Sequence, residues 1–223
     1  MQFQMPFIDL HTHNSSAEEN TIKVVNLFPD VSGLSNISKY ASIGLHPWYI
    51  KDNYIEQLTQ LRTTAQNKMI IAIGEAGLDK AVKINFELQK TVFIAQAKIA
   101  EELSKPMIIH AVKTYNDVIA LRKKITKAPP WIIHGFTGNK NIANELIRNN
   151  FCLSFGKDLF NNKSHAPEVF CNSSYDTIFL ETDDSGLTIK SIYEKASELL
   201  KISTLQLCTQ INNNFQKLFQ IKL

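Results

Sequence analysis

Histidine and acidic residues recur just past the apolar segments of this chain. The motifs are LHTH at 10 to 13, GLH at 44 to 46, GEAGLD at 74 to 79, IIH at 108 to 110, IIHG at 132 to 135 and ETDD at 181 to 184. The side chains in question are those of His11, His13, His46, Glu75, His110, His134 and Asp183. Imidazole nitrogens and carboxylate oxygens are ligands for divalent cations. A metal site is therefore the first chemistry that these residues predict.

Taken one at a time, these signals have ordinary explanations. His11 and His13 have the same parity along a strand, so both side chains can face one cation, but such H-x-H pairs also arise by chance. A lone His110 or His134 is compatible with a buried, hydrogen-bonded histidine, and a lone acidic residue with a structural role. Four imidazoles and two carboxylates that converge on one rim are costly to bury without a cation. The combination therefore favours metal binding.

The ligand types also bear on the identity and number of the ions. Nitrogen and oxygen donors without sulfur suit zinc, manganese, iron, nickel or, less well, magnesium. A tetrahedral catalytic zinc normally takes three protein ligands and a water, and the six residues here exceed that set. They are His11, His13, Glu75, His110, His134 and Asp183. Two divalent ions about 3.5 to 4 Å apart use such a set better, because a carboxylate can bridge them and a shared water becomes more acidic.

The elements that must position these residues are short strands alternating with helices. Eight apolar runs rich in β-branched residues predict strands at Pro6–Leu10, Ile22–Leu27, Tyr40–Leu45, Met69–Ile73, Met107–Ile109, Trp131–Ile133, Phe151–Phe155 and Thr177–Leu180. Helical periodicity predicts helices at Tyr54–Gln66, Phe86–Ser104, Tyr115–Lys124, Lys140–Arg148, Pro167–Cys171 and Ser191–Leu200. A terminal helix is expected to place Leu205, Cys208, Ile211, Phe215 and Leu218 on one side.

This alternation predicts an α/β fold with a parallel sheet, because parallel strands need crossover connections and are buried on both faces. Eight such units indicate a TIM (β/α)8 barrel, in which the chemistry sits on the loops at the carboxyl ends of the strands. The residues that connect His13 to the second strand are few and, apart from Ala17, polar, so we expect a reduced first βα unit. With no linker-like or repetitive tract, residues 1–223 are expected to form a single barrel domain.

Composition agrees with an ordinary globular protein. The 24 basic and 21 acidic residues give a formal charge of +3, which tolerates an anionic substrate without requiring one. The three cysteines form no CxxC pair, which argues against a disulfide framework or a thiolate zinc site and fits a reducing cytoplasm. The start of the chain lacks a signal-peptide pattern, and no membrane-length apolar run is present. We expect a cytoplasmic protein without a membrane anchor or an obligate protein partner.

The motifs IDLHTH, IGLHPW, IGEAGLD, IIHAVK, HGFTG and ETDD, in this order, resemble those of the TatD family of metal-dependent hydrolases. The resemblance extends along nearly the whole chain, to NNNFQKLF at 212 to 219. The family belongs to the amidohydrolase-like TIM barrels, and its better known members are divalent-metal-dependent deoxyribonucleases. The resemblance therefore implies a phosphodiesterase that uses a metal-activated water at a dinuclear centre.

Carried over to this chain, the resemblance assigns roles to individual residues. His11, His13 and Asp183 are expected to hold one metal ion. His110 and His134 are expected to hold the second, with Glu75 bridging the two ions. Asp183 is also expected to act as the general base, so that Asp183 and Glu75 are the catalytic carboxylates. His46 looks like a substrate contact near the scissile phosphate, although a rigid pre-proline turn also explains it. From its position on a strand-end loop, Lys113 is a further candidate for binding phosphate.

The chain departs from the family pattern around the substrate. Nucleases of the family commonly follow the last motif with a proline and a segment containing arginine and asparagine, whereas Ser185, Gly186 and Leu187 stand here. Lys80 and Ala81 replace the aromatic and arginine residues often found after GLD. Three hypotheses follow. The first is hydrolysis of DNA or another phosphodiester, the second is hydrolysis of a small amide, ester or lactone, and the third is a non-catalytic barrel that serves as an interaction protein.

Overall fold

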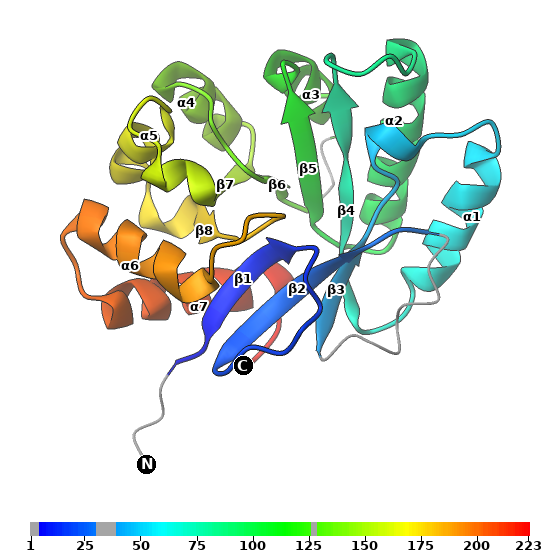
Figure 1. Ribbon diagram of the computed structural model, residues 1–223. Coiled ribbons are helices and arrows are strands. Elements are labelled where there is room, and N and C mark those ends of the chain that lie inside the picture. The colour runs from blue at the N-terminus through cyan, green and yellow to red at the C-terminus, as the bar shows by residue number, and fades with distance from the viewer. Residues whose placement is uncertain (1–4, 30–38, 126–128) are drawn as a thin grey trace. The chain divides into compact units, whose positions relative to one another are not determined.

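A computed structural model describes residues 5–29, 39–125 and 129–223 of the chain. The expectation about the start of the chain concerns, in part, residues 1–4, which lie outside this description. The chain forms two compact units. Unit 1 comprises residues 1–24 and 134–223, and unit 2 comprises residues 25–133. Figure 1 shows the course of the chain through its helices and strands.

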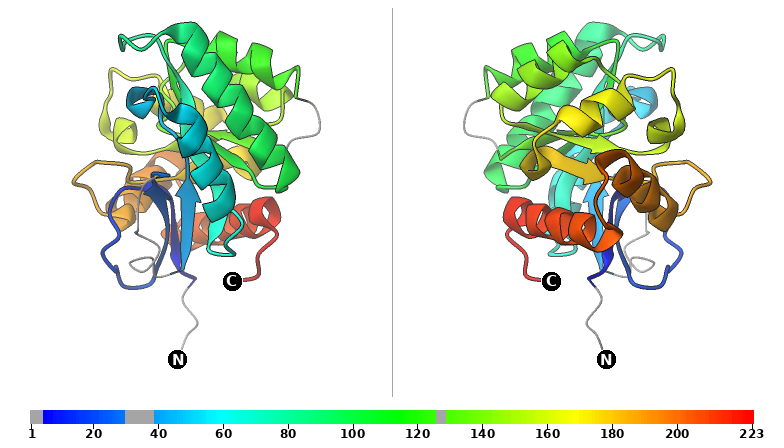
Figure 2. Two further views of the ribbon diagram at one scale, coloured as in Figure 1. Left: turned by 90° about the vertical axis from the view of Figure 1, so that its right-hand side faces the viewer. Right: turned by 90° about the vertical axis from the view of Figure 1, so that its left-hand side faces the viewer.

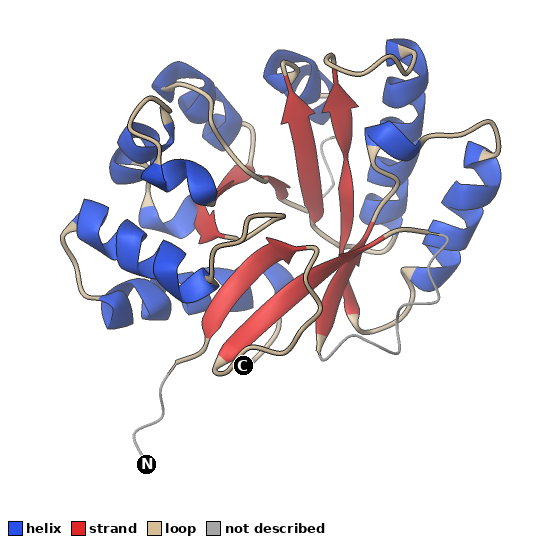
Figure 3. Ribbon diagram, viewed as in Figure 1, coloured by secondary structure: helices blue, strands red, loops and turns tan. Residues whose placement is uncertain are grey.

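Strands and helices alternate along the chain, as the sequence predicts (Figure 3). The strands are β1 (Phe7–Thr12), β2 (Thr21–Leu27), β3 (Tyr40–Ile43), β4 (Ile70–Asp79), β5 (Met107–Val112), β6 (Trp131–Ile133), β7 (Phe151–Phe155) and β8 (Ile178–Leu180). The α-helices are α1 (Tyr54–Thr64), α2 (Phe86–Glu102), α3 (Tyr115–Arg122), α4 (Lys140–Arg148), α5 (Ala166–Asn172), α6 (Ile189–Leu200) and α7 (Thr204–Phe219). Short 3-10 helices η2 (Pro47–Tyr49), η3 (Lys157–Phe160) and η4 (Tyr175–Thr177) complete the description.

The strands are neighbours in the sheet in the order in which they occur in the chain, from β1 to β8. The described pairings of β3 with β4, β4 with β5, β5 with β6 and β7 with β8 are all parallel. This is the strand order of the predicted (β/α)8 class. Between β1 and β2, the described residues 13–20 contain no helix, which confirms the reduced first βα unit.

In unit 2, the longest helix covers the longest strand. Helix α2 packs on β4, and α1 lies beside α2 (Figure 2). The buried face of α2 includes Val92, Phe93 and Ala97, and the Phe93 ring meets Trp131 of β6 edge-on at 5.3 Å between ring centroids. Two glutamines, Gln89 and Gln96, are also buried on this face. The predicted helix is therefore confirmed, but its inward face includes polar residues that the apolar periodicity does not select.

In unit 1, α6 and α7 pack on β1 (Figure 1). The Tyr193 hydroxyl of α6 donates to the Ile8 carbonyl at 3.2 Å and accepts from the Ile8 amide at 3.1 Å. Helix α7 buries Cys208, Ile211 and Phe215, as predicted, together with Leu207.

The prediction that Leu205 lies on the buried side of the terminal helix is wrong, because this side chain is 62% exposed. A capping box between Ser203 and Gln206 begins α7 here, so Leu205 lies in its first turn. Which leucine is buried therefore depends on where the helix begins, and not only on the spacing of the apolar residues.

Strand β4 runs beyond its predicted end at Ile73 and continues to Asp79. The sequence places Glu75 in a loop after the strand, whereas the structure places it inside the strand. The extension requires close approach between backbones at Gly77, where an added Cβ would lie 1.9 Å from the His110 carbonyl oxygen. A glycine that resembles a turn signal in the sequence therefore allows the backbone of β4 to lie close to that of β5.

We expect Gly77→Ala to lower the free energy of unfolding by about 3 kcal/mol, since the methyl group cannot fit without moving β5. Gly186→Ala is the matched control because no atom lies within 4 Å of its added Cβ. Its unfolding free energy is expected to stay within about 0.5 kcal/mol of that of the parent protein. Urea denaturation followed by circular dichroism measures both. Equal stabilities of the two variants would contradict the tight β4–β5 contact.

Candidate metal centre

Unit 1 brings together His11 and His13, at the end of β1, with Asp183 after β8. The Asp183 Oδ1 atom lies 3.6 Å from His11 Nε2 and 3.5 Å from His13 Nε2. One ligand atom from each residue lies within 4.8 Å of the others. His11 is fully buried, whereas the side chains of His13 and Asp183 are 34% and 27% exposed. The group is therefore anchored in the core and open on one side.

Backbone hydrogen bonds between the two chain ends hold this arrangement. The Asp183 amide donates to the His11 carbonyl at 2.9 Å, and Thr12 forms a parallel β-bridge with Asp183. Below them, buried Asp9 accepts from the Thr182 amide at 2.9 Å and from its hydroxyl at 2.6 Å. Burial raises the pKa of Asp9 to about 7, against the lowering effect of the Thr182 bonds. Asp9 and Thr182 thus connect β1 to the segment carrying Asp183.

His134 also belongs to unit 1 and lies close to His11, with 4.6 Å between ring centroids. Its Nδ1 atom is 3.3 Å from the Oε1 atom of Glu181, which also accepts from the Gly135 amide at 2.6 Å. Burial opposes ionisation of Glu181, but the hydrogen bond and charge of His134 outweigh it and lower the pKa of Glu181. A carboxylate that pairs with one imidazole nitrogen fixes the orientation of the ring and turns the other nitrogen away from that carboxylate.

Unit 2 contains a second group, made of His46 after β3, Glu75 in β4 and His110 in β5. The Glu75 Oε1 atom lies 3.1 Å from His46 Nε2 and 2.8 Å from His110 Nδ1. The two imidazole rings are 4.3 Å apart between centroids. All three residues are buried, with exposed fractions of 5%, 5% and 9%. One carboxylate oxygen is therefore shared by two imidazoles away from bulk water.

The buried glutamines of α2 position the strand ends that carry this group. The Gln96 side chain accepts from the Leu45 amide at 2.7 Å and donates to the Leu45 carbonyl at 3.0 Å, next to His46. Gln89 does the same for Asp79, at 2.8 and 3.0 Å. An amide side chain that satisfies both backbone groups of one residue replaces a missing strand partner.

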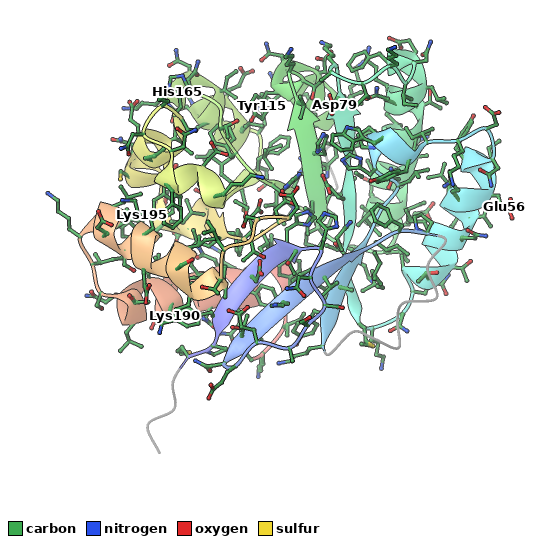
Figure 4. All side chains as sticks on the ribbon, viewed as in Figure 1. Glu56, Asp79, Tyr115, His165, Lys190 and Lys195 are labelled. Carbon is green, nitrogen blue, oxygen red and sulfur yellow. The ribbon has the colours of Figure 1, made fainter. Side chains whose placement is uncertain are left out.

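Asp79 is a neighbour of the His46, Glu75 and His110 group that the sequence analysis does not identify. It lies at the carboxyl end of β4 (Figure 4), where its Oδ2 atom is 3.1 Å from His110 Nε2 and accepts from Trp48 Nε1 at 2.6 Å. Burial opposes ionisation, but the bonds from Trp48, the Ala81 amide and His110 outweigh it and lower the pKa of Asp79. His110 therefore lies between two carboxylates, Glu75 and Asp79.

Sequence reasoning also missed Asn26 and Glu181. The Asn26 Oδ1 atom accepts from the Glu75 amide at 2.6 Å and from the Ser42 hydroxyl at 3.2 Å. For Glu181 a signal exists, because it has the same strand parity as Asp183, just as Asp79 has that of Glu75. For Asn26 the sequence holds no comparable signal, since its role depends on how β2 lies relative to β4.

Lys113 belongs to neither group. It follows the last residue of β5, is exposed, and has a backbone φ of 57°. The predicted binding of phosphate by Lys113 therefore stays a prediction.

The donor sets fit divalent cations. His11, His13 and Asp183 in one unit, and His46, Glu75 and His110 in the other, each supply nitrogen and oxygen atoms within 4.8 Å of one another. Such donors suit zinc and other first-row metals, and the hydrogen-bonded carboxylates behind the histidines are the outer shell that such sites usually have. Within the described ranges, none of the helices has the length and apolar character needed to span a bilayer.

Comparison with known proteins identifies a family and several relatives that match much of the chain. Residues 30–220 match the model of the family described as TatD related DNase. The chain is 32% identical over 201 residues to the uncharacterized metal-dependent hydrolase YabD of Bacillus subtilis, an alignment that covers 82% of this chain and 78% of YabD. It is 31% identical over 103 residues to the 3'-5' ssDNA/RNA exonuclease TatD of Pantoea ananatis, covering 45% of this chain and 40% of that protein.

Among solved structures, the crystal structure of YjjV, a TatD homologue from Escherichia coli, superposes with a TM-score of 0.82. The two sequences are 21% identical, and the match covers 97% of this chain and 98% of the other. This likeness confirms the (β/α)8 barrel fold predicted from the sequence. Together with the family match, it leads to one conclusion: the chain belongs to the TatD related DNase family of metal-dependent hydrolases.

Proposed function

We propose that the protein is a divalent-metal-dependent phosphodiesterase that hydrolyses DNA with an activated water at a dinuclear centre. The observation that supports this most strongly is the Asp183 carboxylate, which lies within 3.6 Å of two imidazole nitrogens and remains partly open to solvent. A ligand set open on one side is what a catalytic metal site needs, because substrate and water must reach it.

The proposed ligands follow the motifs that the chain shares with its family. His11, His13 and Asp183 hold one ion. His110 and His134 hold the second, and Glu75 bridges the two. The group of His11, His13 and Asp183 in unit 1 supports the first ion, and the nearness of Glu75 to His110 in unit 2 supports a shared second ion. The bridging role of Glu75 joins residues of both units and is supported by the resemblance of the motifs. When bound, a pair of divalent ions makes water more acidic and draws charge from the phosphoryl oxygens.

The protein's own side chains complete the chemistry. Asp183 accepts the proton of the attacking water, a task for a carboxylate within hydrogen-bond reach. His46 contacts a phosphate oxygen, supported by its place beside Glu75 and His110. Lys113 is proposed to bind a flanking phosphate, as its charge and exposure allow. The Pantoea relative's name, a single-strand exonuclease, supports DNA as the substrate.

One specific feature favours a second candidate. The segment Ser185 to Leu187 replaces the proline and arginine segment of the resembling nucleases. A small amide, ester or lactone therefore remains the alternative substrate for the same metal ligands.

An assay with manganese or magnesium separates the two candidates. Purified protein is incubated with single-stranded DNA, and in parallel with a panel of carboxylic esters and lactones. We expect metal-dependent release of nucleotides and no turnover of the panel. Intact DNA together with cleaved esters would favour the second candidate over the first. Loss of turnover with a chelator would confirm the need for metal in either case.

Asp79→Asn is expected to weaken metal binding about tenfold, because a carboxylate on the second nitrogen of a ligating histidine fixes the ring and raises its basicity. Asp117→Asn is the control, since Asp117 pairs with Lys80 at 2.6 Å, away from the histidines. Competition with a fluorescent chelator measures the affinity. If Asp79→Asn bound metal as tightly as the parent protein does, the Asp79 carboxylate would serve only as a structural hydrogen-bond acceptor for Trp48.

We also propose that residues 1–223 act as one catalytic domain in the cytoplasm. The family match from 30 to 220 runs through both units, which supports a single domain. The three cysteines are all free thiols, which supports a reducing compartment.

A further inference from the structure

Unit 2 contains a cavity of about 170 Å³ that the proposed mechanism does not use. It is lined by Phe28, Pro29, Leu45, Tyr49, Lys51 and Gln57. The cavity lies beside the group of His46, Glu75 and His110, because Leu45 directly precedes His46 and the Tyr49 ring is 5.7 Å from the His46 ring. A molecule in the cavity would therefore extend from the same face on which the phosphodiester is proposed to bind.

Gln57 supplies the observation that points to a ligand. Its side chain lines the cavity and is only 5% exposed, and its Oε1 atom has no hydrogen-bond partner among the residues that the structure describes. The preceding residue on α1, Glu56, extends into solvent (Figure 4). Buried amide oxygens normally accept a hydrogen bond, so this one is available to a donor that enters the cavity. A ligand with an N–H group supplies such a donor.

The other walls are suited to a flat ring. Phe28 and Tyr49 meet edge-on with 5.0 Å between ring centroids and 87° between planes, and Leu45 closes the apolar floor. Tyr49 is 48% exposed, so its ring is accessible at the mouth. Lys51 places an exposed cation there too. An apolar slot with a buried acceptor and a cation at its mouth matches a nucleotide, whose base is flat and whose phosphate is anionic.

We infer that this cavity is a subsite for a single-ring nucleobase of the substrate strand, held between Tyr49 and the apolar wall and recognised by Gln57. The inference rests on the proposed function, since it names the part of DNA that binds next to the cleaved bond. A cavity of about 150 Å³ accommodates benzene, so this volume suits a pyrimidine better than a purine. The Gln57 oxygen accepts from the cytosine amino group or from the thymine N3–H.

Other occupants fit the lining less well. A metal ion would need carboxylate or imidazole ligands, and none of the lining residues that the structure describes supplies one. A free phosphate would be bound by Lys51, but it would leave the apolar walls without a partner. The described lining thus combines an apolar slot, a buried acceptor and a cation. An anionic molecule that carries a flat ring uses all three.

Calorimetry with deoxycytidine and thymidine 5'-monophosphates tests the subsite without any catalysis. We expect saturable binding by the parent protein and at least about tenfold weaker binding by Gln57→Met, which keeps the volume of the side chain and removes its amide. Gln60→Met, on the exposed side of the same helix, is the matched control and should bind as the parent does. Tyr49→Ala, at a half-exposed position, should weaken binding similarly, with circular dichroism as the check of folding.

Deoxyribose 5-phosphate, which lacks a base, is expected to bind at least about tenfold more weakly than the nucleotides. Three results would overturn the inference: no saturable nucleotide binding up to millimolar concentration, equal affinity of the parent and both variants, or binding of the base-free sugar phosphate as tight as that of the nucleotides. Purine nucleotides that bind as tightly as pyrimidines would overturn the size assignment.

Hydrolysis separates this inference from the proposed function. The rate on a pyrimidine strand is divided by the rate on a strand with an abasic site beside the cleaved bond, and this ratio should fall in Gln57→Met but not in Gln60→Met. If the parent protein cleaves no DNA at all, the proposed function fails while calorimetry still decides the subsite. If it cleaves intact and abasic strands at equal rates, the function stands and the subsite fails.

Discussion

Asp183→Asn is expected to reduce the rate of DNA hydrolysis about 10³-fold while leaving the fold intact. Asparagine keeps the size of the side chain, and the backbone bond from the Asp183 amide to the His11 carbonyl is independent of the carboxylate. The variant loses the proton acceptor and the negative charge beside His11 and His13. Steady-state nuclease rates in manganese, with circular dichroism as the check of folding, measure the effect.

Asp184→Asn provides the control for this experiment. The Asp184 carboxylate is the next one along the chain, but it is 70% exposed and pairs with Lys157 at 2.9 Å. An exposed ion pair of this kind contributes little, at most about 1 kcal/mol, so we expect nuclease rates close to those of the parent. If the two variants were equally active, Asp183 would have no role in proton transfer.

Glu75→Ala is expected to have the largest effect on metal content, lowering the occupancy of both ions at once. In unit 2, the Glu75 Oε1 atom lies within 3.1 Å of both His46 and His110, so its removal leaves two buried imidazoles without their shared anion. The proposed bridging role extends the loss to the ion held by His11 and His13. Elemental analysis after reconstitution and dialysis gives the metal stoichiometry directly.

Two further variants make the stoichiometry informative. His134→Ala removes a ligand of one ion only, so it should lose about half of the metal that the parent binds. Glu87→Ala removes a carboxylate that is 79% exposed and pairs with Lys90, and it should bind as much metal as the parent. Parent-like metal content in Glu75→Ala would reject the bridging assignment, and a loss identical to that of His134→Ala would place Glu75 on one ion alone.

The fold could be predicted because its physical cause is local. Buried parallel strands need continuous apolar runs, and runs such as Trp131–Ile133 and Phe151–Phe155 stand out from their neighbours and match β6 and β7 residue for residue. The missing first helix is equally visible, because residues 14–20 are few and, apart from Ala17, polar. Strand ends were harder to predict. The glycines of GEAGLD resemble a turn, yet they extend β4 to Asp79.

The grouping of His11 with His13 and Asp183, and of Glu75 with His110, could also be predicted, because these residues follow the apolar runs in a regular way. Their roles as metal ligands stay predictions. The supports of these residues could not be predicted. Gln89 and Gln96 lie on the buried face of α2, where periodicity predicts apolar residues, and their role appears only when the ends of β3 and β4 lie next to the helix. Asn26 likewise acquires its role through the Glu75 amide, 49 residues away in sequence. Contacts of this range depend on tertiary structure and leave no local pattern.

The most direct test of the central claim is a crystal structure of the protein with manganese, examined in anomalous difference maps. We expect two strong peaks about 3.5 to 4 Å apart, one coordinated by His11, His13 and Asp183 and the other by His110 and His134, with Glu75 contacting both. A single peak, or peaks whose coordination excludes these side chains, would contradict the dinuclear centre on which the proposed hydrolysis depends.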